Sequence, residues 1–386
     1  MTKLAMKYCK RCVMPDTRPD IVFNEEGICD PCVSTEKKNK EVNWEERKQK
    51  FEEIVNKYKS KSPGQYDCVI PVSGGKDSTY QVYVMTKVYG LKPLCVCFEP
   101  TIPTKIGLRN LRNLNRMGVD LIHFKKNPVA YKKLVRKGLE RVGDNEWPNH
   151  AGIFTVPVNM ALKFKIPLII WGENPQLEYG GPVSSRESKV LDRRWLEEFG
   201  GLLGNRVEDM IDEDVSLSDL KPYIYPSDEE IKEVGVTGVF LGYFFPWDSR
   251  NQIKIIKKEC NWKSKGTPME GSYTDFEDLD CHSMVIHEYL KHVKYGFGRG
   301  TDHACTDIRK GRMSREEAVK LVNEHDGKIP EEALKAFLKY LKISREEFFK
   351  MIEPFTNNLI FKKDEKGNFL RDKLYNLIKK DEYVLR

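Results

Sequence analysis

A glycine-rich hexapeptide, Ser73-Gly74-Gly75-Lys76-Asp77-Ser78, lies between two segments of different character. The apolar run 68–72 before it predicts a short buried strand, and the residues after it predict a helix that extends to about Tyr89. Two glycines at such a strand-to-helix turn let backbone N–H groups approach a phosphate closely, and the helix N-terminus adds positive potential. This unit restricts the chain to an α/β fold with a phosphate site at one end of a sheet.

The rest of the first half repeats the alternation of short apolar runs with longer segments of mixed polarity. We expect further strands at 94–98, 120–124 and 166–171, and helices near 106–117, 128–141 and 153–164. This rhythm predicts an α/β protein with a parallel, doubly wound sheet, in which ligands bind outside the carboxyl ends of the strands. Residues 175–265 hold Gly, Pro and aromatic clusters, and either long functional loops or a short fifth strand fits them.

Changes in composition divide the chain into four parts. We expect a cysteine knuckle at 1–35, an amphipathic helical linker at 36–65, a nucleotide-binding α/β domain at 66–265, and substrate-site loops with a helical C-terminal region at 266–386. In the last part, Ser314-Arg315-Glu316-Glu317 and Ser344-Arg345-Glu346-Glu347 each match a capping box at a helix start.

Composition indicates a globular protein without a membrane span. Of the 386 residues, 40% are hydrophobic and 32% are charged, which predicts a packed core with a polar surface. No run of about eighteen apolar residues occurs, and the N-terminus carries no apolar run of signal-peptide length, so we expect a cytoplasmic location. The net charge of +7 permits polyphosphate or RNA contact but includes no dense basic block, which disfavours a nucleic-acid partner.

Each polar residue of the hexapeptide has a natural role beside a nucleotide. Ser73 and Ser78 can donate to phosphate oxygens, Lys76 can neutralise developing negative charge, and Asp77 can bind Mg²⁺. The sequence is not a Walker A loop, which needs four residues between its first Gly and Gly-Lys-Ser/Thr.

The hexapeptide resembles the PP-loop of the N-type ATP pyrophosphatases, whose pattern is Ser-Gly-Gly-x-Asp-Ser. The resemblance implies that ATP is cleaved between its α- and β-phosphates, with Ser73, Gly74, Gly75, Lys76, Asp77 and Ser78 holding the pyrophosphate. It also implies nucleotide contacts at Gly172, Glu173 and Asn174 after the fourth strand, and adenine framed by the backbone near Phe98. An ordinary loop at 172–174 and plain sheet core at Phe98 stay open as alternatives.

Two Cys-x-x-Cys pairs near the N-terminus predict a metal site. Cys9 and Cys12 are separated from Cys29 and Cys32 by sixteen residues, which fits the spacing of zinc ribbons. Four thiolates complete a tetrahedral shell, so we expect structural Zn²⁺. A redox pair, unliganded thiols or an iron–sulfur cluster are the alternatives. The other six of the ten cysteines, including Cys260, Cys281 and Cys305, carry no local signal beyond a place in the core.

Two later stretches, Gly271–His282 and Tyr295–Cys305, have the composition of site loops. Arg299 could clamp a carboxylate or phosphate, and His303 beside Asp302 could transfer a proton during catalysis. A helix cap or a surface ion pair is the alternative for each of these residues.

Together, the knuckle, the PP-loop and the segments at 172–176, 243–247 and 300–303 resemble the N-acetyl sugar amidotransferases of bacterial surface-polysaccharide and flagellar-sugar biosynthesis. This resemblance implies an enzyme that uses ATP and Mg²⁺ to convert an acetamido group on a sugar into an acetamidino group. The amide oxygen is adenylated, ammonia attacks the resulting O-adenylyl imidate, and AMP and pyrophosphate are released. We expect catalytic roles for Lys76, Asp77, Asp302 and His303 and substrate contacts at Arg299 and Thr301. Lipopolysaccharide O-antigen sugars and pseudaminic acid are candidate substrates.

The chain contains no recognisable glutaminase module, so ammonia must come from elsewhere. The resemblance implies a separate glutaminase subunit similar to the glutaminase and cyclase pair of the histidine pathway. The main alternative is a PP-loop enzyme that modifies tRNA, either a thiolase or a lysidine-type enzyme. A nucleotide-binding scaffold without activity is disfavoured by the intact Lys76-Asp77-Ser78.

Overall fold

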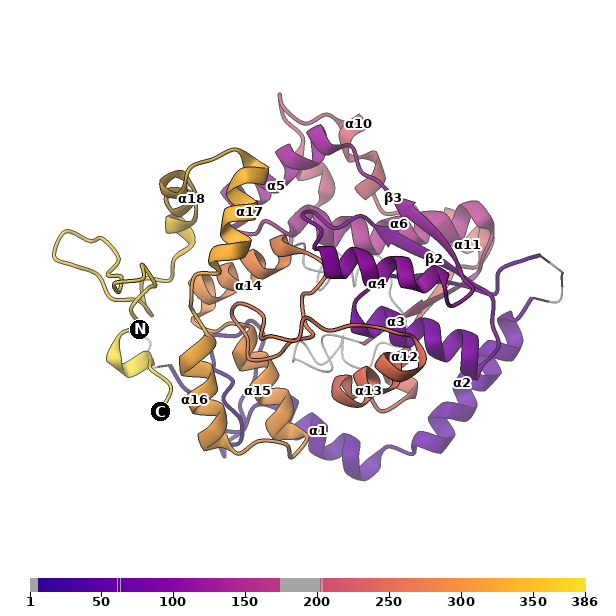
Figure 1. Ribbon diagram of the computed structural model, residues 1–386, viewed down its shortest axis with the longest axis horizontal. Helices are drawn as coiled ribbons and strands as arrows, with labels where there is room; N and C mark the ends of the chain where they lie inside the picture. The colour runs from indigo at the N-terminus through magenta and orange to yellow at the C-terminus, as the bar shows by residue number, and fades with distance from the viewer. Residues whose placement is uncertain (1–5, 61, 63, 174–201, 203) are drawn as a thin grey trace.

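A computed structural model of the chain describes residues 6–60, 62, 64–173, 202 and 204–386 (Figure 1). Five strands form one sheet: β1 (Cys68–Pro71), β2 (Pro93–Phe98), β3 (Asp120–Phe124), β4 (Leu168–Trp171) and β5 (Thr237–Phe240). Their order is β3-β2-β1-β4-β5, and every pairing is parallel. The predicted α/β doubly wound sheet is confirmed. For residues 175–265 the sequence allowed either long loops or a short fifth strand, and β5 is that strand.

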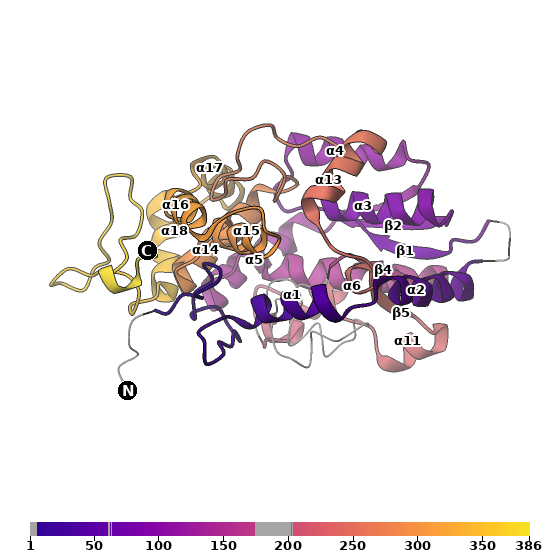
Figure 2. The same cartoon turned by 90° about the horizontal axis from the view of Figure 1, so that it is seen from below.

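Both faces of the sheet are buried, as a parallel sheet requires. Along β1, Val69 packs into one hydrophobic cluster with Tyr131 and Trp147, whereas Cys68 and Ile70 pack into another with Val82 and Leu111. The first face is covered by α5 (Pro128–Val142) and α6 (Trp147–Phe164), and the second by α3 (Lys76–Tyr83) and α4 (Lys105–Asn115) (Figure 2).

The strand order reverses between β1 and β4, although these two strands run parallel. β2 and β3 extend the sheet on one side of β1, and β4 and β5 extend it on the other. In open α/β sheets, a crevice forms outside the carboxyl ends of the strands at such a point. Both the PP-loop after β1 and Gly172 after β4 lie there, so the topology brings together two segments of the predicted nucleotide site.

Several boundaries differ from the sequence prediction. The N-terminal part forms two helices, α1 (Asp30–Glu41) and α2 (Trp44–Tyr58), and α1 begins inside the predicted knuckle. Asn43 separates them because its side chain accepts from Glu46 N and caps α2. α6 begins at Trp147, earlier than expected, because Pro148 fits the first helical turn, where a missing N–H costs nothing. The helix after the PP-loop continues from α3 as a π-helical turn, Val84–Val88.

Short helices follow the part of the chain that is left undescribed: α10 (Leu217–Leu220), α11 (Asp228–Val234), α12 (Leu241–Phe244) and α13 (Ser249–Glu259), with 3-10 turns at Val207–Met210 and Lys221–Tyr223. The C-terminal region is helical, with α14 (His282–Tyr295), α15 (Arg299–Arg309), α16 (Arg315–His325), α17 (Glu331–Leu341) and α18 (Arg345–Ile352), and 3-10 turns at Glu353–Phe355 and Asp381–Tyr383. This confirms the predicted helical C-terminal region.

Both predicted capping boxes lie at helix starts, but only one of them makes both hydrogen bonds of a capping box. Ser314 and Glu317 form a complete box at α16, whereas Ser344 at α18 shows the bond from Glu347 N alone. α14 packs against α17 and α15 against α16, and this bundle lies beside the sheet domain (Figure 1). None of the described helices combines the length and apolar content that crossing a lipid bilayer demands.

Candidate functional site

The PP-loop backbone is fixed by two neighbouring segments. Gly74 has φ +84°, and a Cβ there would lie 2.6 Å from Leu111 N, so only glycine fits. The Trp262 indole N–H donates to Gly74 O over 3.0 Å. Gly75 caps α3, whose N-terminal N–H groups therefore face the loop. The strand–turn–helix context predicted for the loop is confirmed.

Hydroxyl and carboxyl groups of the loop face the site. Ser73 Oγ accepts from Gly75 N at 3.2 Å, and Ser78 Oγ donates to Gly75 O at 3.3 Å. Asp77 Oδ1 is buried and has no hydrogen-bond partner among the described residues. An unpaired carboxylate oxygen beside a phosphate loop fits the predicted Mg²⁺ ligand, because Mg²⁺ is usually held by one or two carboxylates together with substrate phosphates.

A large cavity opens at this edge of the sheet. It contains about 1000 Å³ of space not filled by protein, including its mouth. Its walls come from the PP-loop, the ends of the strands and α6: Pro71, Val72, Ser73, Asp77, Ser78, Gln81, Val96, Phe98, Pro100, Asn149, Ile153, Phe154, Pro157, Trp171, Gly172, Glu173, Phe240, Asp280, Cys281 and Met284. The apolar walls suit an adenine ring, and the polar groups are concentrated at the PP-loop end.

The other predicted nucleotide contacts lie on this cavity. Phe98 ends β2, and its ring packs so tightly on α6 that a Cβ at Gly152 would lie 2.4 Å from it. Gly172 lies against Gln81, whose Nε2 would be 2.6 Å from an added Cβ. Glu173 also lines the wall, whereas Asn174 falls outside the described residues.

Lys76 lies buried between two carboxylates. Its Nζ is 2.6 Å from Asp77 Oδ2 and 2.8 Å from Glu277 Oε1. Burial by itself lowers the pKa of Lys76, but the attraction of Asp77 and Glu277 raises that pKa above its usual value. The ammonium group therefore stays charged, as a residue that stabilises phosphate charge must.

Glu277 connects the PP-loop to the C-terminal region. Besides Lys76, its carboxylate faces Arg299 Nη2 at 3.1 Å and His303 Nε2 at 3.6 Å. Although burial raises the pKa of Glu277, its cationic neighbours Lys76 and Arg299 bring the net pKa well below the ordinary range. Glu277 lies in the predicted site loop Gly271–His282 but was not itself among the predicted site residues, because the composition of the loop does not show which of its acids meets the distant Lys76.

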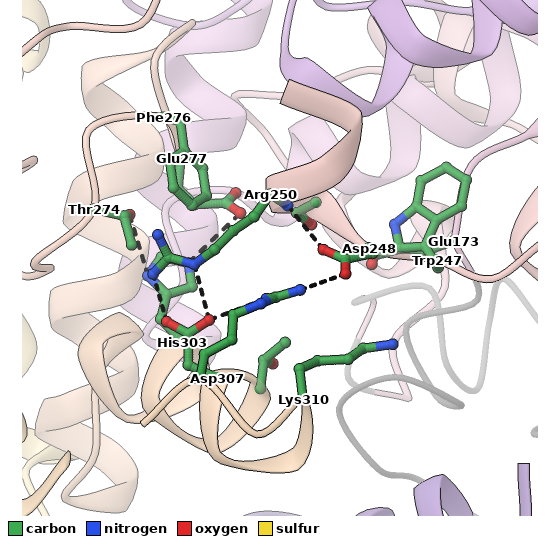
Figure 3. Close-up of a pocket in the computed structure, with 13 residues that line it drawn as sticks. Glu173, Trp247, Asp248, Arg250, Thr274, Phe276, Glu277, His303, Asp307 and Lys310 are labelled. Carbon is green, nitrogen blue, oxygen red and sulfur yellow. Dashed lines mark hydrogen bonds and ion pairs between the residues drawn. The ribbon is translucent and has the colours of Figure 1, made fainter. Parts of the chain in front are cut away.

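His303 faces a second cavity, which holds about 490 Å³. Its Nδ1 lies 2.7 Å from Ser272 Oγ and 3.3 Å from Thr274 Oγ1. Burial lowers the pKa of His303, so its imidazole is neutral at physiological pH. Figure 3 shows His303, Thr274 and Glu277 on one side of this cavity and Glu173 and Trp247 on the other.

Glu173 lines both cavities, so they meet at that residue. The second cavity is rimmed by paired charges. Arg250 Nε donates to Asp307 Oδ1 at 2.9 Å, and Arg312 donates to Asp248 and Asp307. Tyr273 OH also donates to Asp307, at 2.9 Å. These ion pairs fix a polar wall suited to a hydroxyl-rich ligand.

Two predicted residues point elsewhere. Asp302 pairs with Arg18 at 3.2 Å and with Lys291 at 2.6 Å, and it is not among the described residues that line either cavity. Thr301 Oγ1 donates to Asp326 at 2.6 Å. The carboxylate that lies near His303 is therefore that of Glu277 and not that of Asp302. Asp302 and Thr301 contact other protein side chains and have a structural role.

Arg299 is predicted to clamp a substrate anion, but its guanidinium already meets protein carboxylates. It is 3.1 Å from Glu277, 3.8 Å from Asp278 and 3.8 Å from Glu288. A substrate anion would have to displace these acids, so the geometry favours a role for Arg299 in positioning Glu277.

Asp280 is a further cavity residue from the predicted site loop Gly271–His282, although it was not singled out there. Its backbone passes so close to α4 that a Cβ at Gly107 would lie 2.4 Å from Asp280 Cα. Burial raises the pKa of Asp280, and its carboxyl interacts with Ser73 of the PP-loop. The C-terminal segment thus supplies a second carboxyl at the PP-loop end of the cavity.

The four predicted metal ligands come together. The Sγ atoms of Cys9, Cys12, Cys29 and Cys32 all lie within 4.8 Å of one another and are buried. Cys9 Sγ accepts from the backbone N–H of Cys12 at 3.4 Å and of Cys29 at 3.2 Å. Buried sulfurs that receive N–H bonds fit a thiolate metal site, and zinc stays the prediction for the metal.

Residues 270–378 match the sequence model of the family described as LPS biosynthesis protein WbpG-like, C-terminal domain. This region carries Glu277, Asp280 and His303. An uncharacterised protein of Methanocaldococcus jannaschii is 24% identical over 327 residues, which are 84% of this chain and 95% of that protein.

Two solved structures are similar over most of their length. NMN synthetase from Francisella tularensis is 14% identical, with a TM-score of 0.33, and the match covers 74% of this chain and 93% of that one. The U34-tRNA thiolase NcsA from Methanococcus maripaludis with its [4Fe-4S] cluster is 12% identical, with a TM-score of 0.23, and the match covers 79% and 86%.

Proposed function

We propose that this protein is an ATP-dependent amidotransferase that converts an N-acetyl group of a bacterial surface sugar into an acetamidino group. The observation that carries the proposal is the contact chain Lys76–Glu277–His303, which joins the PP-loop to a neutral histidine in the adjoining cavity. Such an arrangement serves a reaction in which a phosphate leaves at one end and a proton is removed at the other.

The first step transfers AMP to the amide oxygen. ATP lies with its adenosine against the apolar wall of the large cavity and its β- and γ-phosphates on the PP-loop amides, Ser73 and Ser78. The acetamido oxygen attacks the α-phosphorus, and the bond from that phosphorus to the oxygen bridging to the β-phosphate breaks. The amide nitrogen loses its proton to the departing pyrophosphate, whose charge Lys76 stabilises. Mg²⁺, held by Asp77, would neutralise phosphate charge.

The second step replaces the adenylate with nitrogen. Ammonium must lose one proton before its lone pair can attack, and the neutral imidazole of His303 accepts that proton. A C–N bond forms at the imidate carbon, the C–O bond to AMP breaks, and the amidinium product keeps the positive charge. Glu277 stabilises the imidazolium because it is ionised and lies 3.6 Å from the ring.

The sugar lies in the second cavity, with its acetamido group at Glu173, where the two cavities meet. The WbpG-like match over 270–378 supports a substrate from lipopolysaccharide biosynthesis, since this region forms much of that cavity. The candidate sugars include an O-antigen uronic acid and pseudaminic acid, whose carboxylate would compete with Asp248 and Asp307 for Arg250 and Arg312. A separate glutaminase subunit would supply the ammonia.

The direct test incubates the protein with ATP, Mg²⁺, ammonium chloride and a panel of N-acetyl sugars, including acidic ones. Mass spectrometry should show a product about one dalton lighter, because NH replaces O, together with an equal amount of AMP. Formation of ADP, or no sugar-dependent AMP across the panel, would contradict the proposal. Purified protein that retains tRNA, with an affinity that falls steeply as the salt concentration rises, would favour the tRNA-modifying alternative.

A further inference from the structure

A smaller cavity lies beside Arg299, and His303 is not among the described residues that line it. It holds about 260 Å³ and is lined by α14 and by loops around it: Glu270, Gly271, Val285, Glu288, Tyr289, His292, Gly298, Arg299, Gly327, Lys328 and Pro330. Val285, Glu288, Tyr289 and His292 are spaced three and four positions apart, so one face of α14 forms its floor. A space of this size is too small for a nucleotide or an activated sugar.

Arg299 separates this cavity from the proposed catalytic site. Its Nη1 is 3.8 Å from Glu288 Oε1 in the small cavity, and its Nη2 is 3.1 Å from Glu277 Oε2 at the site. Beyond Glu277 lies His303. The small cavity and the proposed site of nitrogen attack are therefore joined through one long, rotatable side chain, which could move to let a small molecule pass.

The lining favours a small donor of hydrogen bonds. Glu288 contributes a carboxylate that is 11% exposed and that also pairs with Lys291 and Arg299. His292 is 4% exposed, and its Nδ1 has no hydrogen-bond partner among the described residues. Burial lowers the pKa of His292 well below its usual value, so the ring is neutral and offers an acceptor nitrogen. A carboxylate and an unpaired imidazole together match the N–H groups of ammonium.

We propose that this cavity is the entrance for ammonia, which binds as ammonium between Glu288 and His292 and passes Arg299 to reach His303. The inference rests on the proposed amidotransferase reaction, in which the entering cation gives one proton to His303 and then forms the C–N bond as AMP departs. Placing the nitrogen on the opposite side of Glu277 from the sugar cavity keeps the two substrates on separate routes.

The kinetic test uses two variants of the small cavity. Val285→Phe fills the space, and Glu288→Gln keeps its volume but removes the negative charge. We expect either change to raise the KM for ammonium chloride about tenfold or more, while sugar-dependent ATP–pyrophosphate exchange and the KM for ATP stay unchanged. Val129→Phe and Glu324→Gln, at exposed positions, are the matched controls.

A second measurement does not depend on turnover. Crystals soaked in rubidium chloride, with rubidium as the ammonium substitute, should show an anomalous peak near Glu288 and His292 that Glu288→Gln abolishes. An unchanged ammonium KM in folded Glu288→Gln protein, or a wild-type cavity without rubidium, would overturn the proposed entrance. Absence of sugar-dependent AMP in the wild type, with rubidium still bound, would instead refute the proposed reaction and leave a cation site.

Discussion

At the scale of single residues, Glu277 determines how the site is charged. It is buried against Lys76 and Arg299, and breaking a buried ion pair costs about 3–5 kcal/mol because the partner charges lose their compensation. We therefore expect Glu277→Gln to lower the denaturant midpoint and to reduce sugar-dependent AMP formation by about 10²–10³-fold. Glu316→Gln, at an exposed position on α16, should change neither.

The same residue predicts a pH dependence of stability. The pKa of Glu277 in the folded protein lies below its unfolded value of about 4.3. Its contribution to the free energy of unfolding is therefore fully present above that pH and is lost as pH falls through the folded pKa. Denaturant titrations at a series of acidic pH values should show that the free energy of unfolding falls less steeply with decreasing pH in Glu277→Gln than in the wild type. An identical slope would show that Glu277 is not linked to acid unfolding.

Asp302 and His303 are neighbours in sequence with different expected effects. Asp302, whose pKa is lowered to about 2, bonds Arg18 and Lys291, so Asp302→Asn should reduce thermal stability while the folded fraction keeps its kcat. His303→Gln should leave sugar-dependent pyrophosphate exchange intact but slow amidine formation by about 10²–10⁴-fold. Equal loss of both activities in His303→Gln would remove the histidine from the ammonia step.

At the scale of elements, the PP-loop depends on segments that pack around it. The hydrogen bond from Trp262 to Gly74 O is buried, and leaving that carbonyl unpaired costs about 1–3 kcal/mol. We expect Trp262→Phe to raise the KM for ATP about five- to a hundredfold, since the ring still fills its place but the loop loses its anchor. Trp44→Phe on α2 is the control, and an unchanged KM for ATP in Trp262→Phe would contradict the anchoring role.

At the scale of the whole molecule, the cysteine knuckle braces the C-terminal helices. Arg18 pairs with Asp302 of α15, and Thr17 Oγ1 donates to Tyr295 O at 2.6 Å at the end of α14. Metal analysis should find one zinc per chain, and strong chelators should lower the unfolding temperature of the whole protein. Cys12→Ser should lose the metal, whereas Cys260→Ser, outside the knuckle, should keep it. If the protein instead contained iron and sulfide, with the visible absorption of an iron–sulfur cluster, the metal would be assigned as that cluster and not as zinc.

Local sequence was enough to predict those parts of the protein that depend on neighbouring residues. The strand–helix alternation, the PP-loop between β1 and α3 and the four cysteines of the knuckle each carry their signal within a short segment. Their physical causes are local as well: apolar periodicity, the freedom of Gly74 at positive φ, and the spacing of two thiolate pairs.

Tertiary structure alone brought Glu277, Asp280 and Trp262 to a loop that lies far from them in sequence. It also separated Asp302 from His303, because successive residues of α15 point about 100° apart around the helix. One therefore faces Arg18 and Lys291, and the other faces the cavity. Sequence fixes which groups a segment offers, but the packing of segments determines which groups meet, since burial and ion pairing act between residues distant along the chain.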